Sequence, residues 1–207
     1  MNHIIIRKGH DIRIAGIPSK DVVSIPGSDT VAISPKTFRG VKPKRMVSEG
    51  DRVQIGSPLF FDKTKPEVKW ASPANGTVQT IQFGARHVIE KIEIKVEGSD
   101  SISGQTFLME QLESADRQII LNRILEANLF PLIRQRPFNK VANPKDLPRD
   151  IFISAVNTAP LSVDLRTVIE SEKEAFQAGI TALSKLTDGR VFVTSRNVIE
   201  LQNAEVQ

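Results

Sequence analysis

The chain has 207 residues, 40% of them hydrophobic and 25% charged, which is enough apolar material for one large or two small globular domains. The 28 basic and 24 acidic residues give a net charge of only +4, so nucleic acid is not an expected partner. The absence of cysteine excludes disulfides, thiolate nucleophiles and thiolate-bound zinc or iron–sulfur sites in this sequence. No apolar run is long enough to span a bilayer, and we expect no signal peptide.

The sequence of the N-terminal segment predicts short strands that carry no metal-binding site. Four strands are expected, at Ile4–Arg7, Ile12–Ile14, Val22–Ile25 and Val31–Ile33. His3 and His10 flank the first of them, but no carboxylates or thiols stand at ligand spacing. We therefore expect no metal site.

The loop Pro35–Pro43 carries three basic residues around the aromatic Phe38. A basic loop with an exposed aromatic residue suits docking on a partner or on an anionic lipid surface. The alternative is a solvated connector without a binding role. The candidate docking residues are Lys36, Phe38, Arg39 and Lys42.

The most regular stretch runs from Val47 to Ile81 and contains two turn clusters, Glu49–Asp51 and Ala74–Gly76. Each cluster is followed by alternating apolar and polar residues. Asn-Gly between such runs is the strongest short-range hairpin signal, because both residues tolerate positive φ. Short strands joined by tight turns at this density, with a further strand expected at His87–Val96, predict a small β-barrel or sandwich.

The pattern GDxVxxGxxL followed by SPxxGxV, beginning here at Gly50 and Ser72, resembles the biotinyl/lipoyl-type barrel-sandwich hybrid. In carrier domains of that type a lysine at a hairpin tip bears the cofactor, and Lys63 stands near that place. The resemblance therefore implies one possible function, a biotin or lipoate carrier module with an appended α/β domain, modified on Lys63 or Lys65. No methionine flanks these lysines and Pro66 lies beside them, so we interpret the barrel as structural.

The polar segment 98–104 marks a change from strands to alternating helices and strands. A helix is expected at Asp116–Leu129, with Ser114 or Asp116 as its N-cap. A strand, a long helix and another strand then follow, at Ile151–Val156, Asp164–Leu186 and Val191–Thr194. This order is typical of a βαβ unit with a parallel sheet.

We therefore predict an α/β protein (α+β overall) with two domains. A β-rich barrel-sandwich hybrid is expected at 1–98. An incomplete Rossmann-like α/β domain is expected at 105–207, with its sheet unfinished at the last segment.

Several landmarks together point to one family. They lie at Glu49–Asp51, Phe61–Lys63, Ala71–Gly76, Leu132–Val141, Ile151–Ala155 and Glu174–Gly179. In these segments the chain resembles the N-terminal part of the A-type subunit of the Na⁺-translocating NADH:quinone oxidoreductase (Nqr). The stretch RQRPFNK (Arg134–Lys140) is the most specific of them. Members of that family are longer, so the resemblance implies a truncated chain.

That family is in turn similar to the nucleotide-binding and flavin-binding subunits of the Rnf complex and complex I. In those relatives a glycine-rich loop cradles phosphate with backbone N–H groups. The equivalent stretch here, Phe130–Phe138, has no glycine, and the relatives' acidic motif reads Asn157–Pro160 without a carboxylate. We expect this chain to bind no FMN, NADH or other cofactor and to carry no catalytic residue.

The resemblance implies a non-flavin, membrane-peripheral component of a Na⁺-pumping NADH:ubiquinone reductase, at the cytoplasmic face of the bacterial inner membrane. It would contribute to the quinone-reducing end and to assembly, and the isolated chain is expected to be inactive. The implied partners are the other subunits, integral membrane ones above all, with ubiquinone as the substrate of the complex.

A quinone requires an apolar slot for its ring and donors for its carbonyl oxygens. The candidate quinone-binding residues are Arg134, Arg136, Pro137, Phe138 and Lys140. In the alternative interpretation, Leu132 and Phe138 belong to the core and the arginines pair with carboxylates of a neighbouring subunit.

Overall fold

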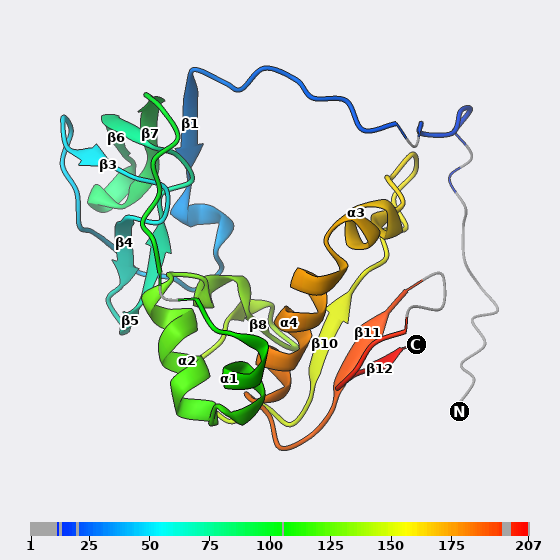
Figure 1. Cartoon of the computed structure of the whole chain (residues 1–207). Helices are drawn as coiled ribbons and strands as arrows, with labels where there is room; N and C mark the ends of the chain where they lie inside the picture. Colours follow the sequence, from blue (N-terminus) through cyan, green and yellow to red (C-terminus); the bar gives the residue numbers. More distant parts are fainter. Residues whose placement is uncertain (1–11, 13, 20, 105, 196–199, 207) are drawn as a thin grey trace.

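The computed structural model describes residues 12–206 apart from 13, 20, 105 and 196–199 (Figure 1). His3, His10 and the predicted strand Ile4–Arg7 therefore lie outside the described residues. A β-rich half and an α/β half lie side by side in Figure 1. No helix in the described part of the chain is long and apolar enough to cross a membrane.

Two small antiparallel sheets form the β-rich half. The first has the order β1-β7-β6-β3, with β1 (Thr30–Ile33), β7 (Ile89–Val96), β6 (Gly76–Phe83) and β3 (Arg52–Val53). The second has the order β2-β4-β5, with β2 (Pro43–Arg45), β4 (Pro58–Asp62) and β5 (Lys65–Ala71). Alternate residues point inward because side chains of a strand alternate between its faces, and Val68, Trp70, Ile92 and Ile94 are buried. The predicted barrel-sandwich architecture is confirmed.

The predicted hairpin at Ala74–Gly76 is wrong. Strands β5 and β6 belong to different sheets, so this turn carries the chain from one sheet to the other. A Cβ atom on Gly76 would lie 1.8 Å from the backbone oxygen of Lys95. The glycine is therefore required because two backbones approach each other closely here. The sequence Asn-Gly is compatible with this arrangement as well as with a hairpin turn, so it does not distinguish them.

The strand predicted at Val22–Ile25 is also absent. This segment is part of a coil that passes from β1 toward α3 (Leu165–Ser171) in Figure 1, and Val22, Val23 and Ile25 are exposed. Ile12 and Ile14, the described ends of another predicted strand, are also coil. A strand needs a hydrogen-bonded neighbour, and none of these segments has one among the described residues.

The α/β half confirms the predicted βαβ unit. Strands β10 (Ile151–Ser154) and β11 (Val191–Thr194) pair in parallel, with Ile151 opposite Val191, and β12 (Glu205–Val206) adds a third strand. The remaining elements are the helices α1 (Met109–Ser114), α2 (Arg117–Glu126), α3 and α4 (Lys173–Ser184), the 3₁₀ turns Pro35–Thr37, Ala85–His87 and Phe130–Leu132, and the strands β8 (Arg134–Gln135) and β9 (Lys140–Val141).

The helix predicted at Asp164–Leu186 is two helices, α3 and α4. They meet at Glu172, which has the non-helical angles φ −128° and ψ 36°. Asp164 caps α3 by accepting a hydrogen bond from the backbone N–H of Arg166. Both helices place apolar side chains, Ile169 and Ile180 among them, on one small core against the parallel sheet.

The larger of the two apolar cores runs through both halves. It contains Trp70 and Ile92 from the barrel together with Ile120, Phe130 and Val141 from the second half. The two halves are thus packed against each other, and the predicted domain boundaries at 98 and 105 stay a prediction.

Candidate functional site

The basic loop that precedes β2 is held at the tip of the β4–β5 hairpin. Lys63 and Thr64 form the two-residue tip. The backbone N–H of Lys63 donates to the carbonyl oxygen of Lys42 at 2.9 Å. Asp62, which is buried, accepts hydrogen bonds from the backbone N–H groups of Lys42 and Thr64. The carboxylate therefore fixes the loop and the tip to each other.

The same loop contacts a second hairpin on its other side. Strands β8 and β9 pair antiparallel, with Gln135 opposite Lys140, and Arg136–Asn139 form the tip. Arg39 donates from Nη1 to the carbonyl oxygen of Phe138 at 3.5 Å. From the sequence, these two segments are expected to have separate roles, docking and quinone binding. In the structure they share one surface.

An aromatic stack connects this surface to the barrel core. The Arg134 guanidinium lies over the ring of Phe38, 4.9 Å from its centroid. Phe38 meets Trp70 edge-on at 5.2 Å, and Trp70 stacks on Phe60 at 4.9 Å. Phe38 is half-buried by these contacts, so the expectation of an exposed aromatic residue in the loop is wrong at this position.

Phe138 is the exposed aromatic residue of the region. It is 63% exposed at the β8–β9 tip, and Leu132, just before β8, is 72% exposed. Both values contradict the interpretation that these residues belong to the core. Arg136, Pro137 and Lys140 are exposed as well, whereas Arg134 is half-buried against Phe38.

We call the segment 38–42, the tip Lys63-Thr64 and the segment 136–140 together the two-hairpin surface. Its exposed cations are Arg39, Lys42, Lys63, Arg136 and Lys140. None of the five forms an ion pair with a described carboxylate, and Asp62 is occupied by backbone N–H groups. Lys36 differs, because its ammonium group pairs with Glu90 of β7. The surface thus gathers five positive charges, none of them in an ion pair with a described carboxylate.

Lys65, next to the β4–β5 tip, faces the second half of the chain. Its Nζ donates to the carbonyl oxygens of Val141 at 3.0 Å and Ala142 at 3.2 Å. An ammonium group has three donors and no acceptor, so these two bonds commit it to the backbone beside β9. This contact fixes the base of the second hairpin on the barrel.

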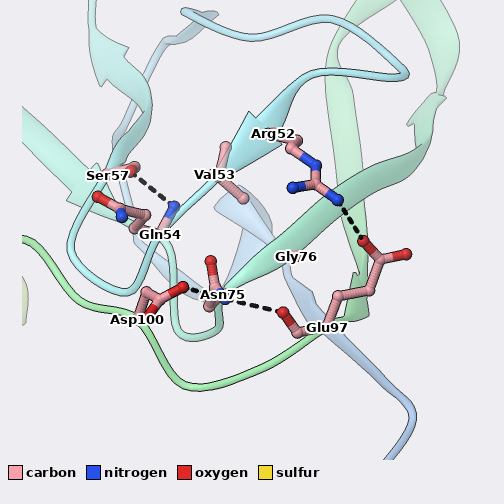
Figure 2. A pocket seen from close by; sticks show the side chains of 8 residues that line it. All are labelled: Arg52, Val53, Gln54, Ser57, Asn75, Gly76, Glu97 and Asp100. Atoms are coloured by element: carbon pink, nitrogen blue, oxygen red, sulfur yellow. Dashed lines mark hydrogen bonds and ion pairs between the residues drawn. The ribbon is translucent and has the colours of Figure 1, made fainter.

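A polar hollow of about 370 Å³ lies elsewhere, at the crossing between the two sheets (Figure 2). Figure 2 shows Arg52 reaching toward Glu97, 3.6 Å away, and Asn75 placed between Glu97 and Asp100. Asn75 Nδ2 donates to the carbonyl oxygen of Glu97 at 2.8 Å. Because the polar groups that line the hollow bond to one another, we interpret them as stabilising the place where the chain crosses between the two sheets.

A second hollow, of about 290 Å³, lies between the N-terminal coil and residues 158–162. Neither hollow is lined by a residue of the two-hairpin surface. Among the described residues, no three histidine or acidic side chains are grouped to hold a metal ion.

Comparison with known proteins agrees with both halves of the fold. Residues 4–97 match the NqrA N-terminal barrel-sandwich hybrid domain, and residues 115–207 match the NqrA second alpha/beta domain. The chain belongs to the NqrA family. Its curated relatives include the A-type subunits of the Na(+)-translocating NADH-quinone reductases of Saccharophagus degradans and of Yersinia pseudotuberculosis, each 38% identical, and that of Klebsiella pneumoniae, 36% identical. Each comparison covers 91% of this chain and 42% of the relative, so the chain spans less than half the length of these relatives.

Within the NqrA fold, the structure brings together residues that the sequence does not connect. Asp62 and Lys65, which organise the surface through backbone groups, carry no sequence signal for that role. Lys63 does occupy a hairpin tip, as the carrier resemblance implies. Its backbone N–H bonds to Lys42, and the adjoining Lys65 bonds to the second hairpin, so the β4–β5 tip is held by its neighbours on both sides.

Proposed function

We propose that this chain is a non-flavin, membrane-peripheral part of a Na⁺-pumping NADH:ubiquinone reductase. Its two-hairpin surface contributes to the quinone-reducing end and docks on integral membrane subunits at the cytoplasmic face of the bacterial inner membrane. The proposal rests on membership of the NqrA family. It also rests on one observation, the exposure of Phe138 beside cations that have no described ionic partner.

The chemistry of the surface suits a quinone. The Phe138 ring offers an apolar face, while Arg136 and Lys140 offer donors for a quinone carbonyl oxygen. A bound small molecule is usually enclosed over most of its surface, but this hairpin tip is open. We infer that the second wall of the site comes from another subunit, so that quinone binding and assembly depend on the same residues.

The structure also supports a chain without its own nucleotide site. A phosphate loop must present free backbone N–H groups. In the equivalent stretch, the N–H groups of Leu132 and Ile133 donate to Leu129 and Phe130 within a 3₁₀ turn, and Ala142 donates back to Ile133. The N–H groups of Leu132 and Ile133 are therefore bonded within the chain itself. We therefore propose that FMN and NADH bind elsewhere in the complex.

Two substitutions in the assembled reductase test the proposal, Phe138→Ala and Arg136→Ala. We expect each to lower quinone reductase activity or assembly while the thermal melt of the chain stays normal. Phe152→Ala is the matched control, because Phe152 of β10 is 65% exposed and lies outside this surface. Normal activity and normal assembly in both variants would contradict the proposal.

The position of Lys63 at a hairpin tip favours one other function, a biotin or lipoate carrier. Intact-mass measurement separates the two functions. A carrier has a fixed mass increment that is lost in Lys63→Arg, whereas we expect the unmodified mass for this chain.

A further inference from the structure

The two-hairpin surface gathers cations from segments that are far apart in the sequence. Elsewhere on the molecule cations often stand beside carboxylates: Arg52 and Lys95 contact Glu97, and Arg190 contacts Glu205. On the two-hairpin surface five cations come from three separate segments, and none of their charged groups forms an ion pair with a described carboxylate. Like charges gathered without partners repel one another, so this arrangement favours an anionic partner.

The residue types indicate what kind of partner this is. Three of the five cations are lysines, Lys42, Lys63 and Lys140. Lysine is depleted in protein–protein interfaces. A flexible ammonium group suits a fluid array of phosphates, which has no fixed geometry to match. Anionic lipid headgroups are such an array.

Phe138 supplies the apolar part of a membrane contact. An aromatic ring flanked by basic residues settles at the boundary between headgroups and acyl chains. The Phe138 ring stands at the hairpin tip between Arg136 and Lys140. The bond from Arg39 to the Phe138 carbonyl and the bonds from Lys65 beside β9 fix the tip on the barrel.

We propose that the two-hairpin surface lies on an anionic bilayer, with its five cations at the lipid phosphates and Phe138 at the acyl boundary. This inference rests on the proposed function and deepens it, since it names the anionic leaflet around the integral subunits as a further contact of the same surface. It also places the candidate quinone residues where a quinone dissolved in the bilayer presents its ring.

Vesicle binding of the 207-residue chain tests the inference. The vesicles contain equal parts of phosphatidylethanolamine and phosphatidylglycerol, and pure phosphatidylcholine vesicles serve for comparison. We expect sedimentation with the anionic vesicles only, declining as salt is added. The double variant Arg136→Glu/Lys140→Glu should bind at least about tenfold more weakly, because each juxtamembrane cation contributes to attraction by the leaflet.

Matched variants separate the surface from net charge. Arg149→Glu/Lys173→Glu changes the net charge equally outside the two-hairpin surface and should bind like the wild type. Phe138→Ala should weaken binding, and Phe152→Ala should not. Equal binding to both vesicle types, or full binding by Arg136→Glu/Lys140→Glu with a normal melt, would overturn the inference.

The assembled reductase distinguishes this inference from the proposed function. If the chain does not bind anionic vesicles but the double variant fails to assemble into the reductase, the surface is a protein interface. In that case the lipid inference fails and the proposed function stands. If vesicle binding follows the predicted pattern while the double variant keeps full quinone reductase activity and assembly, the proposed role of the surface fails and the lipid inference stands.

Discussion

The guanidinium carbon of Arg134 lies 4.9 Å from the centroid of the Phe38 ring, and this contact joins the two halves of the chain. Arg134 belongs to β8 of the second half, and Phe38 belongs to the loop before β2 of the barrel. Such a cation–π contact contributes about 0.5–1 kcal/mol at a partly exposed site. Because Phe38 also meets Trp70, the position of the second hairpin depends on the packing of the barrel core.

We expect Phe38→Ala to lower the free energy of unfolding by about 2 kcal/mol, part of the cost of a fully buried phenylalanine. Chemical denaturation measures the loss. Phe83→Ala on β6 is the control, because Phe83 is 45% exposed and contacts only His87 among the described rings. An equal loss in both variants would mean that the stack with Arg134 and Trp70 has no special weight.

Phe138→Ala should change the free energy of unfolding by no more than about 0.5 kcal/mol, because a side chain 63% exposed leaves little cavity behind. Phe60→Ala, at a fully buried ring of β4, should cost about 3–5 kcal/mol. Thermal melts of the two variants make the comparison. A large loss of unfolding free energy in Phe138→Ala would show that Phe138 is a core residue and does not belong to the candidate site.

Two neighbouring lysines of one hairpin should respond differently. Lys65→Met leaves the Val141 and Ala142 carbonyl oxygens without their charged donor and should cost about 1–3 kcal/mol. Lys63→Met, at the exposed tip, should stay within about 0.5 kcal/mol. Equilibrium unfolding in urea gives both values. The role assigned to Lys65 is wrong if the two variants are equally stable.

Gly76→Ala should destabilise the barrel by at least about 3 kcal/mol, because the added Cβ clashes with a backbone oxygen that cannot move unless its strand shifts. Gly27→Ala is the control, since a Cβ there meets no atom within 4 Å and the change should stay within about 0.5 kcal/mol. Expression level and melting temperature report both effects. A stable Gly76→Ala variant would show that the two sheets can separate slightly at the crossing.

The environment of Asp150 predicts one part of the pH dependence of folding stability. The backbone N–H of Arg190 and then the Arg149 guanidinium lower the pKa of this carboxyl below its ordinary value. A lowered folded-state pKa stabilises the protein above about pH 4, and the stabilisation is lost as pH falls through the folded pKa. Asp150→Asn should therefore differ from the wild type most above that range and least in stronger acid.

Urea unfolding at a series of pH values measures this dependence. Arg149→Ala should keep most of it, because the bond from the Arg190 backbone has the larger influence and the Arg149 side chain is 89% exposed. If Arg149→Ala behaves like Asp150→Asn, the ion pair is the main cause.

Local signals predicted the elements that are stabilised locally. Asp116 caps α2 as expected, accepting from the backbone N–H of Ile119 at 2.8 Å, and the alternation of β7 was readable because one of its faces is buried. The strand expected at Val22–Ile25 failed because apolar β-branched residues indicate a strand only when another strand is there to pair. The break at Glu172 has no local cause, since neither glycine nor proline lies at 171–173.

The candidate site shows the same limit. Resemblance singled out Arg134–Lys140, and composition singled out the loop around Phe38. Nothing in the sequence indicates that Arg39 and Phe138, 99 positions apart, are in contact. That contact depends on the packing of the second half against the barrel, as does the use of Lys65 beside β9.

The buried position of Trp70 has a practical consequence for every experiment on this surface. The sequence contains one tryptophan and no tyrosine, so the ultraviolet emission of the protein comes almost entirely from one indole. Trp70 is 2% exposed, and its ring directly contacts Phe38, the innermost residue of the two-hairpin surface. A quinone, a partner protein or a bilayer that displaces Phe38 will change the colour or intensity of this emission in the unlabelled protein. An event confined to the parallel sheet will leave the emission unchanged.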